Sequence, residues 1–294
     1  CAKLWSKVVA SRPDYDSLPE ELKNSPNNGA IDGFPVKVYI NNIYHGLYCL
    51  TIPKGAWQFG LNENNPNHAL ISAEINDNGD EALKFNPCNF RYPWNDDYLN
   101  AWEVEVGMND DVIRSSFNGI ITYVTETPNQ SENALDIQSA IDYYIFQDVI
   151  LGIDGLAKNM NLVTYDMTKW YLSAYDMDAT FDLSWEGELL NAYSTGMPDA
   201  PYANRYSELL SFLKTYYNVD MRERYFELRK TVLSYASIIA EFENYVNSYG
   251  EDLYIQDTIV YPEIPSVTTN TLNRLKTCVK NRLEFLDGLY GGEN

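Results

Sequence analysis

The sequence predicts an α+β fold in which a β-rich first third precedes a mostly helical remainder. Residues Pro35–Ile40 alternate in hydrophobicity, Asn41 and Asn42 supply a turn, and Tyr44–Ile52 returns, which is typical of a β-hairpin. From Asp110 onward the apolar residues recur at helical spacing instead. Strands gathered before helices indicate an α+β architecture, although many α+β proteins share this order.

The first part, residues 1–108, mixes extended and helical patterns. Ala2–Ala10 is compatible with a helix, and the run Ser17-Leu-Pro-Glu-Glu-Leu offers an N-cap, an early proline and acidic first-turn residues. Gly46 in the return strand of the hairpin indicates a bulge or a close backbone approach. Further strands are expected at Ala69–Ile75, Ala82–Phe85 and Ala101–Val106, with a turn at Asn76–Asp80.

The second part, residues 109–294, is expected to be a helical lobe interrupted by one hairpin. Its second helix carries an apolar stripe, and Gly152 ends that helix so that Asp154 lies on a loop. Two short strands, Asn161–Tyr165 and Trp170–Tyr175, then form a hairpin. Helices are expected at Asp111–Tyr123, Ala134–Leu151, Arg205–Tyr216, Val219–Tyr249 and Thr269–Leu289.

Composition narrows the classes of function. The 294 residues include 42 acidic and 21 basic side chains, a net charge of −21, which argues against nucleic acid as a partner. The acidity either attracts basic substrates or only maintains solubility. No apolar run has the length needed to span a bilayer. Two histidines and four scattered cysteines do not provide a zinc site or a Ser-His-Asp triad.

Four side chains around the second hairpin form the candidate site. Asp154 is followed five residues later by Asn159, and Asp176 and Asp178 stand where the hairpin ends. Kinase-type folds place an Asp and an Asn on a loop, and a further Asp after a hairpin, to orient the attacking hydroxyl and to hold magnesium. The pattern therefore predicts phosphoryl transfer, with Asp154 as the catalytic residue and the other three as metal ligands.

Plainer interpretations of these residues remain open at this stage. Roughly two Asp-x4-Asn pairs are expected by chance in so acidic a chain, and Asp199 with Asn204 is a second one. Asp154 with the following glycine is also an ordinary turn pair, and Asp176 or Asp178 could cap the segment that follows them. Only the context of helix, hairpin and acidic segment distinguishes the first pair.

Three stretches in order resemble the CotH (spore coat protein H-like) kinase family. They are the hairpin VKVYINNIYHGLYCL, the run GIDGLAKN followed by YDMDATFDLSW, and the terminal LNRLKTCVKNRLEFLDGLYG. The resemblance covers most of the chain and implies an atypical protein-kinase-like fold. It implies ATP and Mg²⁺ or Mn²⁺ as cofactors and Ser phosphorylation on a protein substrate, basic or Ser-rich. It also implies a spore-coat, cell-surface or phage-particle context.

Carried over residue by residue, the resemblance assigns Asp154 to the catalytic loop. It makes Asn159 the amide metal ligand and Asp176 the carboxylate metal ligand, with Asp178 a close competitor. Alternation along a strand end would point both aspartates to one side, where they could share the ion.

Two departures from the family pattern leave a second function open. The family's upstream segment, with a phosphate-covering loop and a phosphate-pairing lysine, is not in the chain, which also has no GxGxxG. Lys54 could approach a phosphate, although a turn lysine in solvent is the favoured interpretation. Gly152-Ile153 replaces the His or Arg that often neighbours the catalytic Asp. Either the chain is a fragment whose N-terminal portion was removed, or it is an inactive pseudokinase that serves as a surface, spore-coat or phage structural and binding module.

Overall fold

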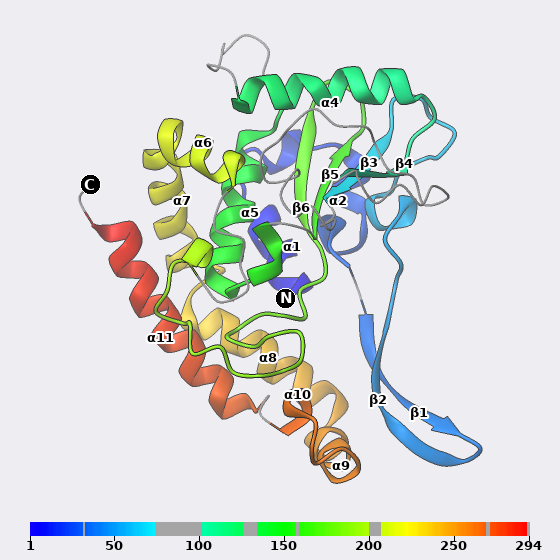
Figure 1. Ribbon diagram of the computed structural model, residues 1–294, viewed down its shortest axis with the longest axis vertical. Helices are drawn as coiled ribbons and strands as arrows, with labels where there is room; N and C mark the ends of the chain where they lie inside the picture. Colours follow the sequence, from blue (N-terminus) through cyan, green and yellow to red (C-terminus); the bar gives the residue numbers. More distant parts are fainter. Residues whose placement is uncertain are drawn as a thin grey trace.

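A computed structural model describes residues 1–31, 33–73, 102–125, 134–156, 159–199, 207–268 and 271–292. Two antiparallel sheets are packed with helices, which confirms the α+β prediction (Figure 1). The predicted turn at Asn76–Asp80 and strand at Ala82–Phe85 lie outside the described residues, as does Asn204. No helix in the described ranges is both long and apolar enough to cross a bilayer.

The larger sheet contains four strands in the order β4-β3-β5-β6, all antiparallel. They are β3 (Ala69–Ala73), β4 (Trp102–Val106), β5 (Met160–Thr164) and β6 (Trp170–Ala174). Every residue of β3 and of β5 is buried, as expected for central strands. The sheet thus combines strands from both sides of the expected boundary at residue 108, and the division into two lobes stays a prediction.

The predicted hairpin near the start of the chain is present as β1 (Gly33–Ile40) and β2 (Ile43–Thr51). Asn41 and Asn42 both have positive φ, 51° and 64°, which a two-residue primed turn requires and asparagine tolerates. The pairing shifts between Val38 and Tyr39, where Val38 lies opposite Gly46, so the expected bulge is confirmed. Figure 1 shows this hairpin projecting from the rest of the molecule.

The helices follow the predicted order with four differences. The expected single helix Val219–Tyr249 is two helices, because the chain leaves helical geometry at Thr231 and Ser234 caps a new helix start. Two further helices between Gly250 and Thr268 were not predicted. The last helix begins at Leu272, capped by Thr271. The α-helices are α1 (Ala2–Ala10), α2 (Glu20–Asn24), α4 (Asp110–Thr125), α5 (Ile137–Ile150), α6 (Glu208–Tyr216), α7 (Asn218–Lys230), α8 (Tyr235–Tyr249), α9 (Glu251–Val260), α10 (Pro265–Thr268) and α11 (Leu272–Gly291).

Helix α5 is buried on nearly all sides. The sequence predicted a single apolar stripe, but residues Ser139–Gln147 are all buried, polar ones included. Helices α1, α7 and α11 and strand β6 pack around it. Since α5 ends directly before Asp154, its surroundings set the position of the candidate catalytic loop.

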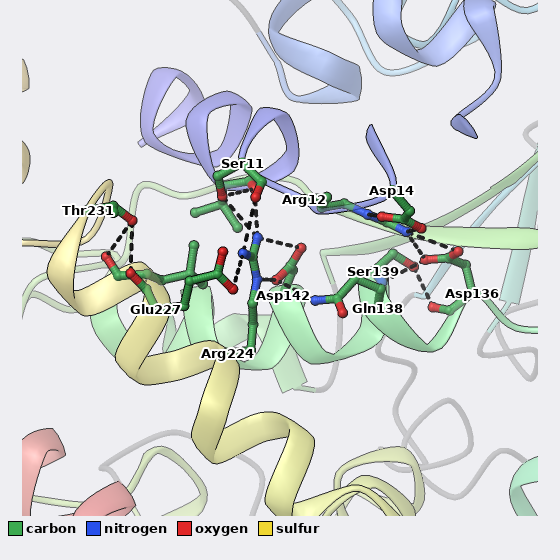
Figure 2. A network of polar contacts seen from close by, with 12 residues as sticks. Ser11, Arg12, Asp14, Asp136, Gln138, Ser139, Asp142, Arg224, Glu227 and Thr231 are labelled. Atoms are coloured by element: carbon green, nitrogen blue, oxygen red, sulfur yellow. Dashed lines mark hydrogen bonds and ion pairs between the residues drawn. The ribbon is translucent and has the colours of Figure 1, made fainter. Parts of the chain in front are cut away.

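A buried ion pair holds α5 to α7 and α1. Arg224 donates from Nε to Asp142 Oδ1 at 2.7 Å and from Nη2 to the Val8 carbonyl at 3.1 Å and Ser11 Oγ at 2.9 Å. Figure 2 shows Arg224 of α7 between Ser11 and Asp142, with Arg12, Asp14 and Asp136 continuing the network. Burial raises the pKa of Asp142 to about 6 against the lowering effect of Arg224, so the carboxylate is still charged at neutral pH.

The Asp142–Arg224 pair generates a stability prediction. Asp142→Asn should destabilise the fold by about 3–5 kcal/mol, because it removes the buried countercharge of the Arg224 guanidinium and leaves only the half-exposed Glu227 to pair with it. The other carboxylate near Arg224 belongs to Glu227, whose side chain is 51% exposed. Its removal in Glu227→Gln should cost less than about 1 kcal/mol. Urea unfolding measures both, and equal losses in the two variants would contradict the assignment.

Candidate active site

The pairing of β5 with β6 sets Asn159 opposite Tyr175, the residue before Asp176. Met160 pairs with Ala174, and beyond this pair the Tyr175 amide donates to the Asn159 carbonyl at 3.2 Å. Asn159 therefore lies opposite Tyr175, one residue from Asp176. Both Asn159 and Asp176 have positive φ, 59° and 48°. Such backbone geometry is uncommon outside glycine and clusters at functional sites.

The amide of Asn159 is buried without a complete set of partners. Its side chain is 7% exposed, and Nδ2 has no hydrogen-bond partner in the described part of the chain. The oxygen and nitrogen of an amide differ little in shape, so a half-turn of the group places Oδ1 at the same point. An incompletely bonded amide beside Asp176 has the donor atom that a hard cation requires.

Asn161, two residues further along β5, is a feature that sequence reasoning missed. It is fully buried, and neither Oδ1 nor Nδ2 has a hydrogen-bond partner among the described residues. Its register neighbours are Ser72 of β3 and Ser173 of β6, so a polar row crosses the sheet. No pattern in the sequence pointed to Asn161, because it stands in a short, otherwise apolar run, residues 160–163, that reads as a buried strand.

Asp154 occupies the short helical turn η4 (Ile153–Leu156) directly after α5, and its side chain is half-buried. The helix ends at Leu151, which takes the left-handed conformation, φ 50°. Gln147 packs so closely against the turn that a Cβ at Gly152 would lie 1.9 Å from its Oε1, and one at Gly155 would lie 2.4 Å from its Cδ. Tyr143 Oη donates to the Gly155 carbonyl at 2.5 Å. The predicted placement after the helix is confirmed, and the turn is held firmly.

Asp176 and Asp178 differ in their surroundings. Asp178 Oδ1 accepts a hydrogen bond from the Ala179 amide at 2.7 Å, as in the capping interpretation, and both aspartates are exposed. Extended geometry ends at Ala174, and Asp176 is left-handed, so the strand alternation expected to align the two carboxylates does not reach them. This part of the sequence prediction was wrong.

Lys54 lies in the protein and not in solvent, contrary to the favoured sequence interpretation. Its side chain is 16% exposed and forms an ion pair with Glu105 of β4, and Nζ lies 3.1 Å from Ser72 Oγ. Ser72 Oγ in turn donates to Glu105 Oε1 at 2.7 Å. Nζ lies 5.4 Å from the ring centroid of Tyr175, the residue before Asp176. A Lys–Glu pair is thus placed beside the candidate metal-binding segment.

The acidic side chains do not form a self-contained metal cage. No three His, Cys, Asp or Glu side chains within the described ranges are grouped to hold an ion. Magnesium in nucleotide sites is commonly bound by one or two carboxylates, with waters and phosphate oxygens completing its shell. Asn159 and Asp176, with Asp178 near them in sequence, fit a site that shares the ion with nucleotide phosphates and waters. They fit less well a site in which protein ligands alone surround the ion.

The backbone of Phe181 ties the acidic segment to the end of α5 and to α11. Its amide donates to the Ile150 carbonyl at 2.5 Å, and its carbonyl accepts from Arg274 Nη1 at 2.6 Å. Phe181 and Asp182 have positive φ, 51° and 71°. Asp182 Oδ1 accepts from the Ala192 amide at 2.6 Å, and burial raises its pKa. The contact of Phe181 with Ile150 fixes the segment after Asp178 to the end of α5, the helix that precedes Asp154.

Arg282 of α11 attaches a later part of the same segment, around Tyr193 and Thr195, to α5. It donates from Nε to the Asp148 carbonyl at 2.7 Å and from Nη1 to the carbonyls of Tyr193 and Thr195, at 3.1 and 2.5 Å. Its side chain is almost completely buried. The two arginines of α11 therefore hold both ends of residues 181–195 against the end of α5, a role that the sequence pattern did not indicate.

A four-stranded antiparallel sheet packed with helices defines an α+β domain, and the four candidate residues precede or follow the β5–β6 hairpin in the sequence. The chain belongs to the CotH kinase protein family, whose model matches residues 30–286. This confirms the resemblance inferred from the sequence. A search of curated proteins found no match.

The Phe181 attachment generates a second prediction. Arg274→Met should lower the hydrogen-exchange protection of the Phe181 amide about tenfold or more, since a hydrogen bond to a charged group contributes about 1.5–3 kcal/mol. Lys280→Met, on the same helix with a side chain 66% exposed, is the control and should leave protection unchanged. Exchange measured by NMR or mass spectrometry tests this. Unaltered protection in Arg274→Met would show that the contact does not hold the segment.

Proposed function

We propose that this domain is an ATP-dependent, divalent-metal-dependent protein kinase that transfers a phosphoryl group to a serine hydroxyl. The observation that carries the proposal is the pairing of Asn159 with Tyr175, which sets a buried amide next to Asp176 at the end of the hairpin. Membership of the CotH kinase protein family supports it. Asn159 and Asp176, with Asp178 as an additional ligand, would hold Mg²⁺ or Mn²⁺, which neutralises nucleotide phosphates when bound.

Asp154 is the proposed catalytic residue. Its loop is immobilised by Gln147 and Tyr143, so the carboxylate can accept a hydrogen bond from a serine hydroxyl in a fixed direction. Orienting the hydroxyl oxygen toward the phosphorus is the main contribution that a kinase aspartate makes, since the transition state needs little proton transfer. A position directly after the rigid helix α5 suits this role.

Lys54 is the proposed phosphate-contacting residue. Its ion pair with Glu105 and its contact with Ser72 hold the ammonium group close to Tyr175. In protein kinases a lysine held by a glutamate contacts the nucleotide phosphates. A cation here would also offset part of the repulsion between an anionic nucleotide and a strongly acidic protein.

The alternative is a binding module that holds nucleotide or a partner without transferring phosphate. One observation favours it. The projecting hairpin exposes large apolar side chains on both strands, among them Phe34, Tyr39, Ile43 and Leu50.

Substitution of Asp154 separates the two functions. Asp154→Asn should lower the rate of phosphate transfer about 10²- to 10⁴-fold, because the hydroxyl loses its orienting acceptor, with ATP affinity nearly unchanged. Asp199→Asn, in the second Asp-x4-Asn pair, is a matched control on an exposed residue and should retain activity. Transfer of labelled phosphate to a serine protein measures the effect. A wild-type protein that binds ATP but transfers nothing would favour the binding module.

Substitution of Asp176 tests the metal role by a measurement that does not need turnover. ATP with Mn²⁺ should raise the melting temperature of the wild-type protein, because a ligand that binds only the folded state stabilises it. Asp176→Asn should abolish that shift, and Asp178→Asn should reduce it less, since its Oδ1 already accepts a backbone hydrogen bond. Chelation of Mn²⁺ should remove the shift in wild type. An equal shift in wild type and Asp176→Asn would exclude the proposed ligand.

A further inference from the structure

Two cavities follow one another along α8, and the first reaches the candidate site. The first, about 280 Å³, is lined by Met177, which stands between the two candidate aspartates, and by Cys49 and Thr51 of β2. The second, about 470 Å³, lies beside α9. Phe242 and Tyr245 of α8 line both. Together the cavities form a trough that leads from the end of the β5–β6 hairpin toward α9.

The second cavity has a distinct chemical character. Leu47, Tyr254 and Ile255 give it an apolar and aromatic wall, and Glu251 and Asp257 add carboxylates. Of the described residues that line it, none is Lys, Arg or His. Its volume is within the range of about 300–1,000 Å³ that ligand sites occupy. Aromatic faces beside carboxylates attract a cation, and apolar walls accept an aliphatic stem or a large apolar side chain.

Polar groups keep this cavity formed and leave one donor in need of an acceptor. Asp257 Oδ1 accepts from Tyr44 Oη at 3.0 Å and from the Leu47 amide at 2.8 Å, which fixes the hairpin against α9. The hydroxyl of Tyr254 is buried and has no hydrogen-bond partner among the described residues. A buried hydroxyl without a partner is costly, so an occupant with a carbonyl oxygen would satisfy it.

We infer that the trough docks a polypeptide segment of the phosphate acceptor in which a large apolar side chain stands next to Lys or Arg. The inference rests on the proposed function: the family resemblance already implies a basic substrate, and the new element is the surface that holds it together with an apolar side chain. The apolar side chain enters the second cavity, the basic group lies near Glu251, and the serine lies toward Met177. The net charge of −21 favours the approach of a basic segment.

Two matched pairs of variants on α9 test the docking. Glu251→Lys and Ile255→Ser alter residues that line the second cavity, and Ile255 is 50% exposed, so the fold should tolerate both. Asp252→Lys changes the neighbouring exposed carboxylate in the same helix turn, and Ile259→Ser changes a residue 74% exposed one turn further. Neither control residue lines the cavity.

The probes are short fluorescein-labelled peptides with a single serine flanked by Leu, Phe, Lys and Arg, and matched peptides with Glu in place of each basic residue. Binding is measured by fluorescence anisotropy without nucleotide, and phosphorylation by steady-state kinetics. The basic peptides should bind more tightly than the acidic ones. Glu251→Lys and Ile255→Ser should weaken binding and raise the peptide KM about fivefold or more, and the two controls less than about twofold. The KM for ATP should not change.

The two measurements separate the failure of docking from the failure of catalysis. Variant-sensitive binding of the basic peptide without phosphorylation would support the docking trough and remove the kinase proposal. Phosphorylation with equal KM for basic and acidic peptides, or equal effects of the cavity and control variants, would overturn the docking inference and leave the kinase proposal intact. Neither binding nor phosphorylation of any peptide would overturn both.

Discussion

The register between β5 and β6 determines where the candidate site residues lie. Because Met160 faces Ala174, Asn159 lies opposite Tyr175, and Asp176 is the first residue beyond that pair. A slip by one residue would turn Asn161 to the opposite face of the sheet. The register is well specified, because β5 is central and buried, paired with β3 on one side and β6 on the other. Backbone pairing of the sheet thus sets Asn159 opposite the residue that precedes Asp176.

Two arginine systems complete this arrangement from the helical side. Arg224 joins α7 to α5 and α1 through Asp142, and the arginines of α11 join residues 181–195 to the end of α5. Buried guanidinium groups carry several donors in a fixed plane, so each one links segments that are distant in sequence. Helix α5 is common to both systems. The position of Asp154 therefore depends on residues from nearly the whole length of the chain.

The fold class and the positions of the main elements could be predicted from local patterns. The Asn41-Asn42 turn, the Gly46 bulge and both hairpins have short-range signatures, and each is present. The break between α7 and α8 was missed because Thr231–Ser234 contains no Gly or Pro. The burial of α5 on all sides was missed because Asp142 and Gln147 are polar, and only their tertiary partners make burial tolerable.

The candidate site could be predicted only in outline. Asp154, Asn159 and Asp176 were placed around the hairpin by their order in the sequence, and that placement depends on adjacent elements alone. Lys54 was named as a group that could approach a phosphate but was placed in solvent, and Glu105 and Arg274 were not recognised. Their contacts join residues far apart in the sequence, as between Ser72 and Glu105 or Arg274 and Phe181. Long-range pairing of this kind leaves no periodic signal in a single sequence.

The projecting hairpin is continuous with the lysine that pairs with Glu105. Strand β2 ends at Thr51, and only Ile52 and the conformationally restricted Pro53 separate it from Lys54. Near its tip, the hairpin is joined to α9 through Asp257. The same strand is therefore fixed to α9 by hydrogen bonds near one end and leads at the other end to the lysine beside Tyr175.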